Sequence, residues 1–98
     1  MTVDASIDPL SYAASLLDAV GADREHIPAD IALECLQAAE LLELAGGQAQ
    51  PIPLVEDDPR ASIRAAMGAL GLLDQDTFTI GYVLDAARAA RRALRRLG

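Results

Sequence analysis

The arginines at the end of the chain are the first candidates for chemistry. The sequence closes with DAARAARRALRRLG, which holds five of the eight basic residues of the protein. At 100° per residue on a helix, all five fall within about 140° of arc and form one basic face. They are Arg88, Arg91, Arg92, Arg95 and Arg96. Such a face can contact phosphates, dock an acidic protein, or pair with carboxylates of its own chain while offsetting the helix dipole.

The charge of the remaining chain bears on that choice. The protein has 15 acidic residues, no Lys and a net charge of −7, although residues 88–98 contain no acid at all. A nucleic-acid binder is normally basic over a whole domain and places aromatic rings among its cations to stack bases. We therefore expect the arginines to pair with acids of this chain or of a protein partner. Phosphate contact is the alternative.

Metal and nucleophile chemistry lacks its usual residues. His26 and Cys35 are the only His and Cys, which excludes the common zinc sites. Glu34, Glu40 and Glu43 turn around their helix instead of converging, and no Glu-x-x-His pair is present for a di-metal centre. Cys35 falls on the expected core face, where a thiol is inert. We expect no metal and no cofactor.

Enzyme motifs are also missing from the sequence. No Ser stands in a nucleophile-elbow context and no Gly-rich phosphate loop occurs, so we expect a non-catalytic protein. The lone Cys and the lack of a basic, apolar leader predict a cytoplasmic location. No apolar run approaches the roughly 20 residues of a membrane span. The Ala-rich, Lys-free composition is typical of a bacterial protein with a high-GC genome.

The elements that must position these residues are predicted to be helices. Apolar residues make up 52% of the sequence and aromatics only 3%, and an Ala- and Leu-rich core favours close helix packing over a sheet. Asp-Pro pairs at 8–9 and 58–59 are typical helix starts, and glycines mark the helix ends. We expect no strand, and helices over 9–20, 28–45, 59–70 and 77–96.

The spacing of apolar residues assigns faces to the first and last of these helices. In the helix over 9–20, Leu10, Leu17 and Val20 are predicted to face the core, whereas Ser11, Ser15 and Asp18 are predicted to face outward. The last helix is predicted to start at Asp76 or Thr77. Its apolar seam is predicted to consist of Ile80, Val83, Ala87, Ala90, Leu94 and Leu97.

These helices predict an all-α fold in a single domain spanning residues 1–98. We expect a small four-helix bundle built from two helical hairpins, 8–47 and 58–98, joined by a connection over 48–57. Pro51 and Pro53 exclude a helix in that connection, whose apolar residues favour an extended course over the core.

The helix over 28–45 is apolar on two sides. Ile31, Cys35 and Leu42 define its core face, and a second set of leucines lies away from it. These are Leu33, Leu36, Leu41 and Leu44. A second apolar face is covered either by the connection or by a partner. We expect these leucines to bind another protein or a second copy of the chain, as in a homodimer.

The sequence thus predicts a small non-catalytic protein–protein interaction module, which would be an adaptor, a regulator or a small accessory subunit. The helix over 28–45 supplies its binding face, and the arginines form a charged docking face. The alternative is a nucleic-acid-associated or transcriptional regulator that uses the Arg-rich C-terminal helix.

Overall fold

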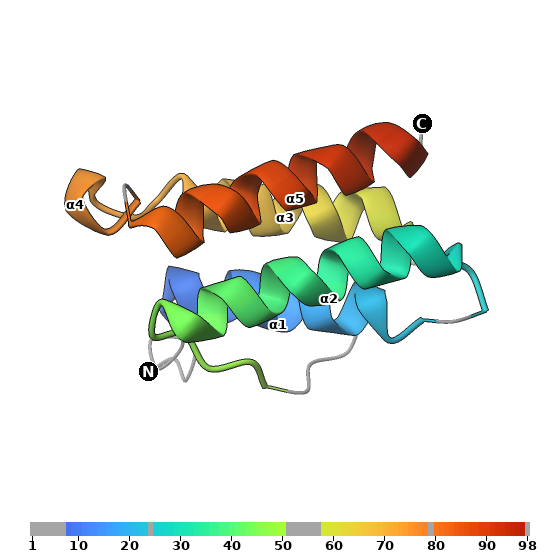
Figure 1. The fold of residues 1–98 in the computed structure, drawn as a ribbon, viewed down its shortest axis with the longest axis horizontal. Coiled ribbons are helices and arrows are strands. Elements are labelled where there is room, and N and C mark those ends of the chain that lie inside the picture. Colours follow the sequence, from blue (N-terminus) through green and yellow to red (C-terminus); the bar gives the residue numbers. More distant parts are fainter. Residues whose placement is uncertain (1–7, 24, 51–57, 79, 98) are drawn as a thin grey trace, which may run out of the picture.

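The computed structural model describes residues 8–23, 25–50, 58–78 and 80–97, and all regular secondary structure in these residues is helical. The prediction of an all-helical protein is confirmed over this part of the chain. The predicted course of the connection at 51–57 lies outside the described residues. The helices are α1 (Pro9–Gly21), α2 (Ala29–Leu44), α3 (Pro59–Leu70), α4 (Gln75–Phe78) and α5 (Gly81–Leu97) (Figure 1).

The four longer helices pack in a ring. α1 contacts α2 and α3, and α5 contacts the same two helices from the other side (Figure 1). Neighbours run antiparallel. Arg96 near the end of α5 pairs with Asp30 at the start of α2, and Arg60 at the start of α3 donates to the carbonyl of Leu97 at the end of α5. One end of the molecule therefore joins the start of α1, the ends of α2 and α3, and the start of α5.

The Asp-Pro pairs begin α1 and α3 as predicted. The carboxylate of Asp8 accepts a hydrogen bond from the backbone N–H of Ser11 at 2.7 Å, and that of Asp58 accepts from the N–H of Arg60 at 3.0 Å. Each side chain satisfies a donor that the first helical turn leaves free. At the end of α2, Gly46 adopts a φ of 111°, which a residue with a Cβ rarely adopts.

The single helix predicted over 77–96 is wrong at its start. The carboxylate of Asp74 accepts from the N–H of Thr77 at 2.7 Å and begins the short α4, while α5 starts afresh at Gly81. Ile80 lies between the two helices and is 40% exposed, so it is not part of the apolar seam. Gly81 inside a continuous helix would lower helix stability by about 1 kcal/mol relative to Ala, and the Asp74 cap starts a separate turn just before it, so the helix breaks between them.

The packed face of α5 is also rotated from the predicted seam. Ala87, Leu94 and Leu97 lie half-buried at the margin of the core. The buried residues of α5 are Val83, Ala86, Ala89, Ala90 and Ala93. Because α5 packs against both α2 and α3, the side chains at the centre of its contact must be small enough for two helices to approach. The larger residues then fill the margins.

Helix α1 has the largest share of buried residues among the described helices. Nine of its 13 residues are buried, among them Ser11 and Ser15, so the prediction that these serines face outward is wrong. The Ser15 hydroxyl donates to the carbonyl of Ser11 at 2.7 Å and accepts from the N–H of Gln50 at 2.8 Å. The Ser11 hydroxyl accepts from the N–H of Gln48 at 3.0 Å. The two serines thus hold the segment after α2 against α1.

Each serine should protect one amide of that segment. Replacing Ser15 with Ala removes the acceptor of the Gln50 N–H and should lower the free energy of unfolding by about 1 kcal/mol. Amide hydrogen exchange should then accelerate at Gln50 more than at Gln48, and Ser11→Ala should give the reverse order. Equal acceleration at both amides in both variants would show that the hydroxyls act only through packing.

Candidate interaction surfaces

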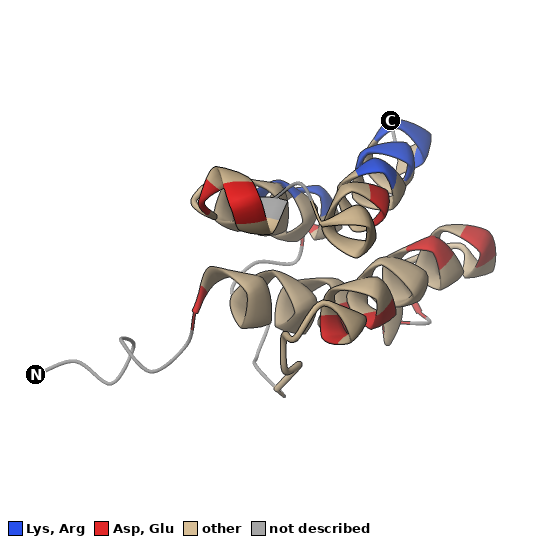
Figure 2. Cartoon of the chain, turned by 60° about the vertical axis from the view of Figure 1, so that its left-hand side comes forward, with Lys and Arg blue, Asp and Glu red and all other residues tan. Residues whose placement is uncertain are grey.

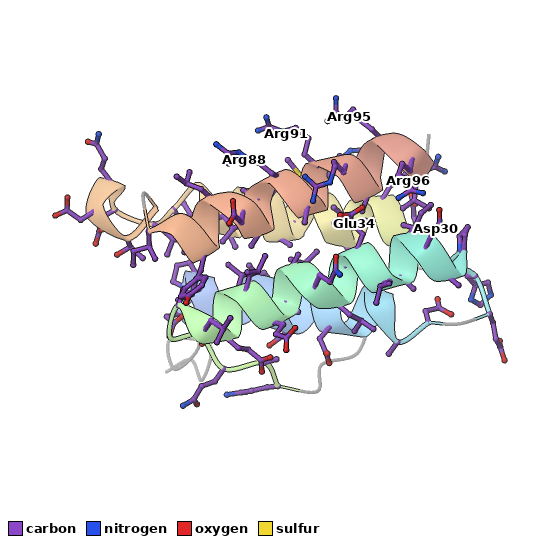
Figure 3. All side chains as sticks on the ribbon, in the orientation of Figure 1. Asp30, Glu34, Arg88, Arg91, Arg95 and Arg96 are labelled. Atoms are coloured by element: carbon purple, nitrogen blue, oxygen red, sulfur yellow. The ribbon has the colours of Figure 1, made fainter. Side chains whose placement is uncertain are left out.

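Two of the five C-terminal arginines pair with α2. The guanidinium of Arg92 donates to Oε2 of Glu34 from Nη2 at 2.9 Å and from Nε at 3.1 Å. The guanidinium of Arg96 bonds both Glu34 and Asp30 (Figure 3). The side chain of Glu34 is only 13% exposed. The acids of these pairs lie near the start of α2 and the arginines near the end of α5. A negative charge at a helix start and a positive charge at a helix end both interact favourably with the helix dipole.

The other three arginines point away from the neighbouring helices, and we call them the outward arginines: Arg88, Arg91 and Arg95 (Figure 3). Arg88 pairs with Asp85, three residues earlier on its own helix, at 3.4 Å, and with no other acid among the described residues. Arg91 and Arg95 make no ion pair with any residue in the described part of the chain. Basic residues are concentrated on α5, whereas most acids lie on other elements (Figure 2). The basic face is thus divided into a side that pairs with α2 and a side that pairs with no other helix in the described residues.

The four leucines predicted as a binding face are not brought together. Leu33 and Leu44 are 56% and 60% exposed, but eleven positions separate them, about 16 Å along the helix. Leu41 is half-buried and packs against the core. Leu36 is half-buried with its side chain against Gly21 of α1. Only the first two of these leucines are free to contact a partner over most of their surface.

A different set of apolar side chains gathers at one end of the molecule. Six large apolar residues are exposed among the described residues, and all except Leu33 belong to the end where α1 and α5 begin and α2 and α3 finish, at the left in Figure 1. We call this set the apolar end, and it consists of Tyr12, Leu44, Leu72, Ile80 and Tyr82. Only Leu44 among them was predicted as a binding residue.

The register of α2 against α5 places two members of the apolar end at the same level of the molecule. Arg92 pairs with Glu34, so ten residues farther toward this end Tyr82 and Leu44 lie at about the same height along the two antiparallel helices. Leu10 packs near Gly47, just past α2, which brings the start of α1 and its Tyr12 to the same end. Two of the three aromatic residues of the chain, Tyr12 and Tyr82, belong to this end and are exposed, which the spacing of apolar residues in the sequence did not indicate.

Cys35 and His26, the only Cys and His of the chain, lie in surroundings that do not favour a role as nucleophile or metal ligand. Cys35 is fully buried, and burial raises the pKa of its thiol to about 11, far from the range of a reactive thiolate. Nδ1 of His26 lies 3.0 Å from a carboxylate oxygen of Asp23, and this hydrogen bond lowers the pKa of Asp23. Within the described ranges, no group of three or more His, Cys, Asp or Glu is placed to hold a metal ion.

Comparisons with protein-family models, with curated proteins and with solved structures found no match to this chain. None of the helices described here combines the length and the apolar composition that crossing a bilayer requires. The two surfaces that the described residues leave exposed for a partner are the apolar end and the outward arginines, of which Arg91 and Arg95 have no ion pair in the described part of the chain.

Proposed function

We propose that this protein is a small non-catalytic module that binds another protein through its apolar end. It would act as an adaptor, a regulator or an accessory subunit. In this proposal the four longer helices form a four-helix bundle of two hairpins, α1 with α2 and α3 with α5, which holds the ends of the helices in fixed positions. The partner is a different protein or a second copy of the chain.

The observation that carries the proposal is that five of the six exposed large apolar residues in the described part of the chain belong to one end of the molecule. Single exposed apolar residues are common on protein surfaces, but a group gathered from several elements is typical of an interaction site. Fully burying a side chain of this size is worth about 1.5–3 kcal/mol relative to exposure. Tyrosine is enriched at interfaces, because its ring buries apolar area while its hydroxyl keeps a polar partner.

In this proposal α2 contributes fewer residues to partner binding than the four leucines that its sequence predicts. Leu44 contributes directly to the apolar end, and Leu41 supports it from the core. Leu33 lies about 16 Å away along the helix and belongs to no such cluster. Two copies related by a two-fold axis would present the same end to one another, which is the commonest closed arrangement of identical chains.

A matched pair of leucine substitutions tests the apolar end. Leu44→Glu and Leu33→Glu add the same charge to exposed positions of the same helix, so both variants should remain folded by circular dichroism. We expect Leu44→Glu to abolish self-association in sedimentation velocity, or the retention of a partner in co-purification, and Leu33→Glu to preserve it. Equal behaviour of the two variants would contradict the proposal.

Association with nucleic acid is the second candidate, and it is supported by the outward arginines. Three guanidinium groups on one exposed helix face, none of them paired with another helix within the described residues, can contact phosphates. The net charge of −7 opposes it, because an extended polyanion must approach acidic parts of the same small molecule. Retention on duplex DNA at about 150 mM salt, lost when all three outward arginines are replaced by Gln, would favour this candidate.

A further inference from the structure

We propose that the outward arginines form a second docking surface, separate from the apolar end, which binds an acidic helical segment of a partner polypeptide. The inference does not depend on the apolar end, because the two surfaces share no residue. It rests on how the structure sorts the five arginines of α5 and on the shape and charge of the face that remains.

Internal pairing accounts for only one side of the arginine face. Arg92 and Arg96 reach the carboxylates of α2, so their charges are used to hold α5 against its neighbour. Arg91 and Arg95 have no such carboxylate among the described residues, in a chain that carries 15 acids. Neutralising the acids of the bundle therefore does not explain them, and their charges are available to a partner.

The spacing of the outward arginines fits a helix. Intervals of three and four residues, from 88 to 91 to 95, place the three guanidinium groups along one line about 10 Å long on an exposed face (Figure 3). A partner helix with carboxylates at matching intervals presents acceptors at the same spacing. Guanidinium groups recognise carboxylates through paired N–H donors, as Arg92 does with Glu34 in this structure.

The surroundings favour carboxylates on a short segment over a nucleic acid. A duplex carries a phosphate charge every 1.7 Å or so and extends beyond the three arginines onto the rest of the surface. There it would meet a molecule whose net charge is −7. At physiological salt, charges are screened over about 8 Å, so a short acidic segment seated on α5 avoids most of this repulsion. No aromatic side chain lies among residues 83–97 to stack a base.

The test uses a synthetic helical peptide with Glu at positions i, i+3 and i+7 of one face, and a control peptide with Gln at those positions. Binding is followed through the arginine Nε–H signals in nitrogen–proton correlation spectra of the intact protein. We expect the Glu peptide to shift the signals of the outward arginines, the signals of Arg92 and Arg96 to move little, and the Gln peptide to have no effect.

Two charge-matched variants make the test decisive. Arg91→Glu should weaken binding of the Glu peptide on the order of tenfold or more, since charged hydrogen bonds are lost and a repulsion is added. Arg64→Glu changes the net charge equally at an exposed position of α3 and should leave the affinity within about twofold. Equal weakening by both variants would reduce the effect to net charge and overturn the proposal.

Three further outcomes bear on the proposal. The absence of shifts at millimolar Glu peptide would overturn it. Tighter binding of a duplex DNA oligonucleotide than of the Glu peptide, at the same salt concentration, would also overturn it and assign the face to nucleic acid. Leu44→Glu should leave Glu-peptide binding unchanged, so that failure at the apolar end and failure at the arginine face are distinguished.

Discussion

Replacing Leu17 with Ala should lower the free energy of unfolding by about 2–5 kcal/mol. Leu17 is fully buried on α1, the helix that packs against both α2 and α3 and carries the segment after α2 on its remaining side. The surrounding helices cannot all close on the cavity that truncation leaves, so both the lost apolar burial and the cavity contribute. Urea denaturation followed by circular dichroism measures the change.

Leu33→Ala is the matched control for this prediction. The same atoms are removed from a leucine that is 56% exposed, and the expected change is within about 0.5 kcal/mol. Similar losses for the two variants would mean that α1 is not the enclosed helix and that Leu33 is buried in solution, as it would be in a stable dimer formed through that residue.

Two glycine-to-alanine substitutions should have opposite signs. A Cβ on Gly21 would lie 2.5 Å from Cγ of Leu36 and 3.0 Å from the carbonyl oxygen of Ala32, so α1 and α2 must separate; we expect a loss of about 1–3 kcal/mol. Gly68 lies on the exposed side of α3, and a Cβ there meets nothing within 4 Å. Gly68→Ala should therefore raise the free energy of unfolding by about 0.4–1 kcal/mol.

The close approach at Gly21 can be isolated with a second substitution. Shortening Leu36 to Ala removes the two side-chain atoms that lie nearest to the new Cβ and leaves the Ala32 carbonyl in place, so Gly21→Ala should cost less in the Leu36→Ala background than in the natural sequence. Thermal or urea unfolding of the four proteins gives the coupling between the two positions. Additive changes would place the steric conflict elsewhere, for example at the Ala32 carbonyl.

Local signals in the sequence predicted most of the helices, because each signal acts within one turn. The carboxylates of Asp8 and Asp58 bond N–H groups two or three residues ahead, so these helix starts do not depend on how distant parts of the chain are packed. The break before α5 was missed because Asp74 competed with the two caps considered, Asp76 and Thr77. The direction of Ser11 and Ser15 was missed for another reason. The N–H groups that donate to their hydroxyls belong to Gln48 and Gln50, 35 or more residues away, where helical periodicity carries no information.

The surfaces were harder to predict than the helices, because they depend on which helices become neighbours. A helical wheel placed five arginines on one face of α5, but only the position of α2 separates the paired Arg92 from the unpaired Arg91. The apolar end depends on register in the same way. Tyr82 and Leu44 are 38 positions apart in the chain and belong to the same end of the molecule because α2 and α5 run antiparallel. Nothing in either local sequence indicates the other.

The burial of Cys35 makes transient openings of the packed helices measurable by a chemical reaction. Its sulfur is covered by the helices around α2, and in the closed state its raised pKa keeps the group a thiol rather than a thiolate. A thiol reagent can then react only during transient openings, and the labelling rate is the open fraction multiplied by the rate for an unprotected thiol. The chain thus carries a built-in reporter of its own fluctuations, at a single known position and without any introduced probe.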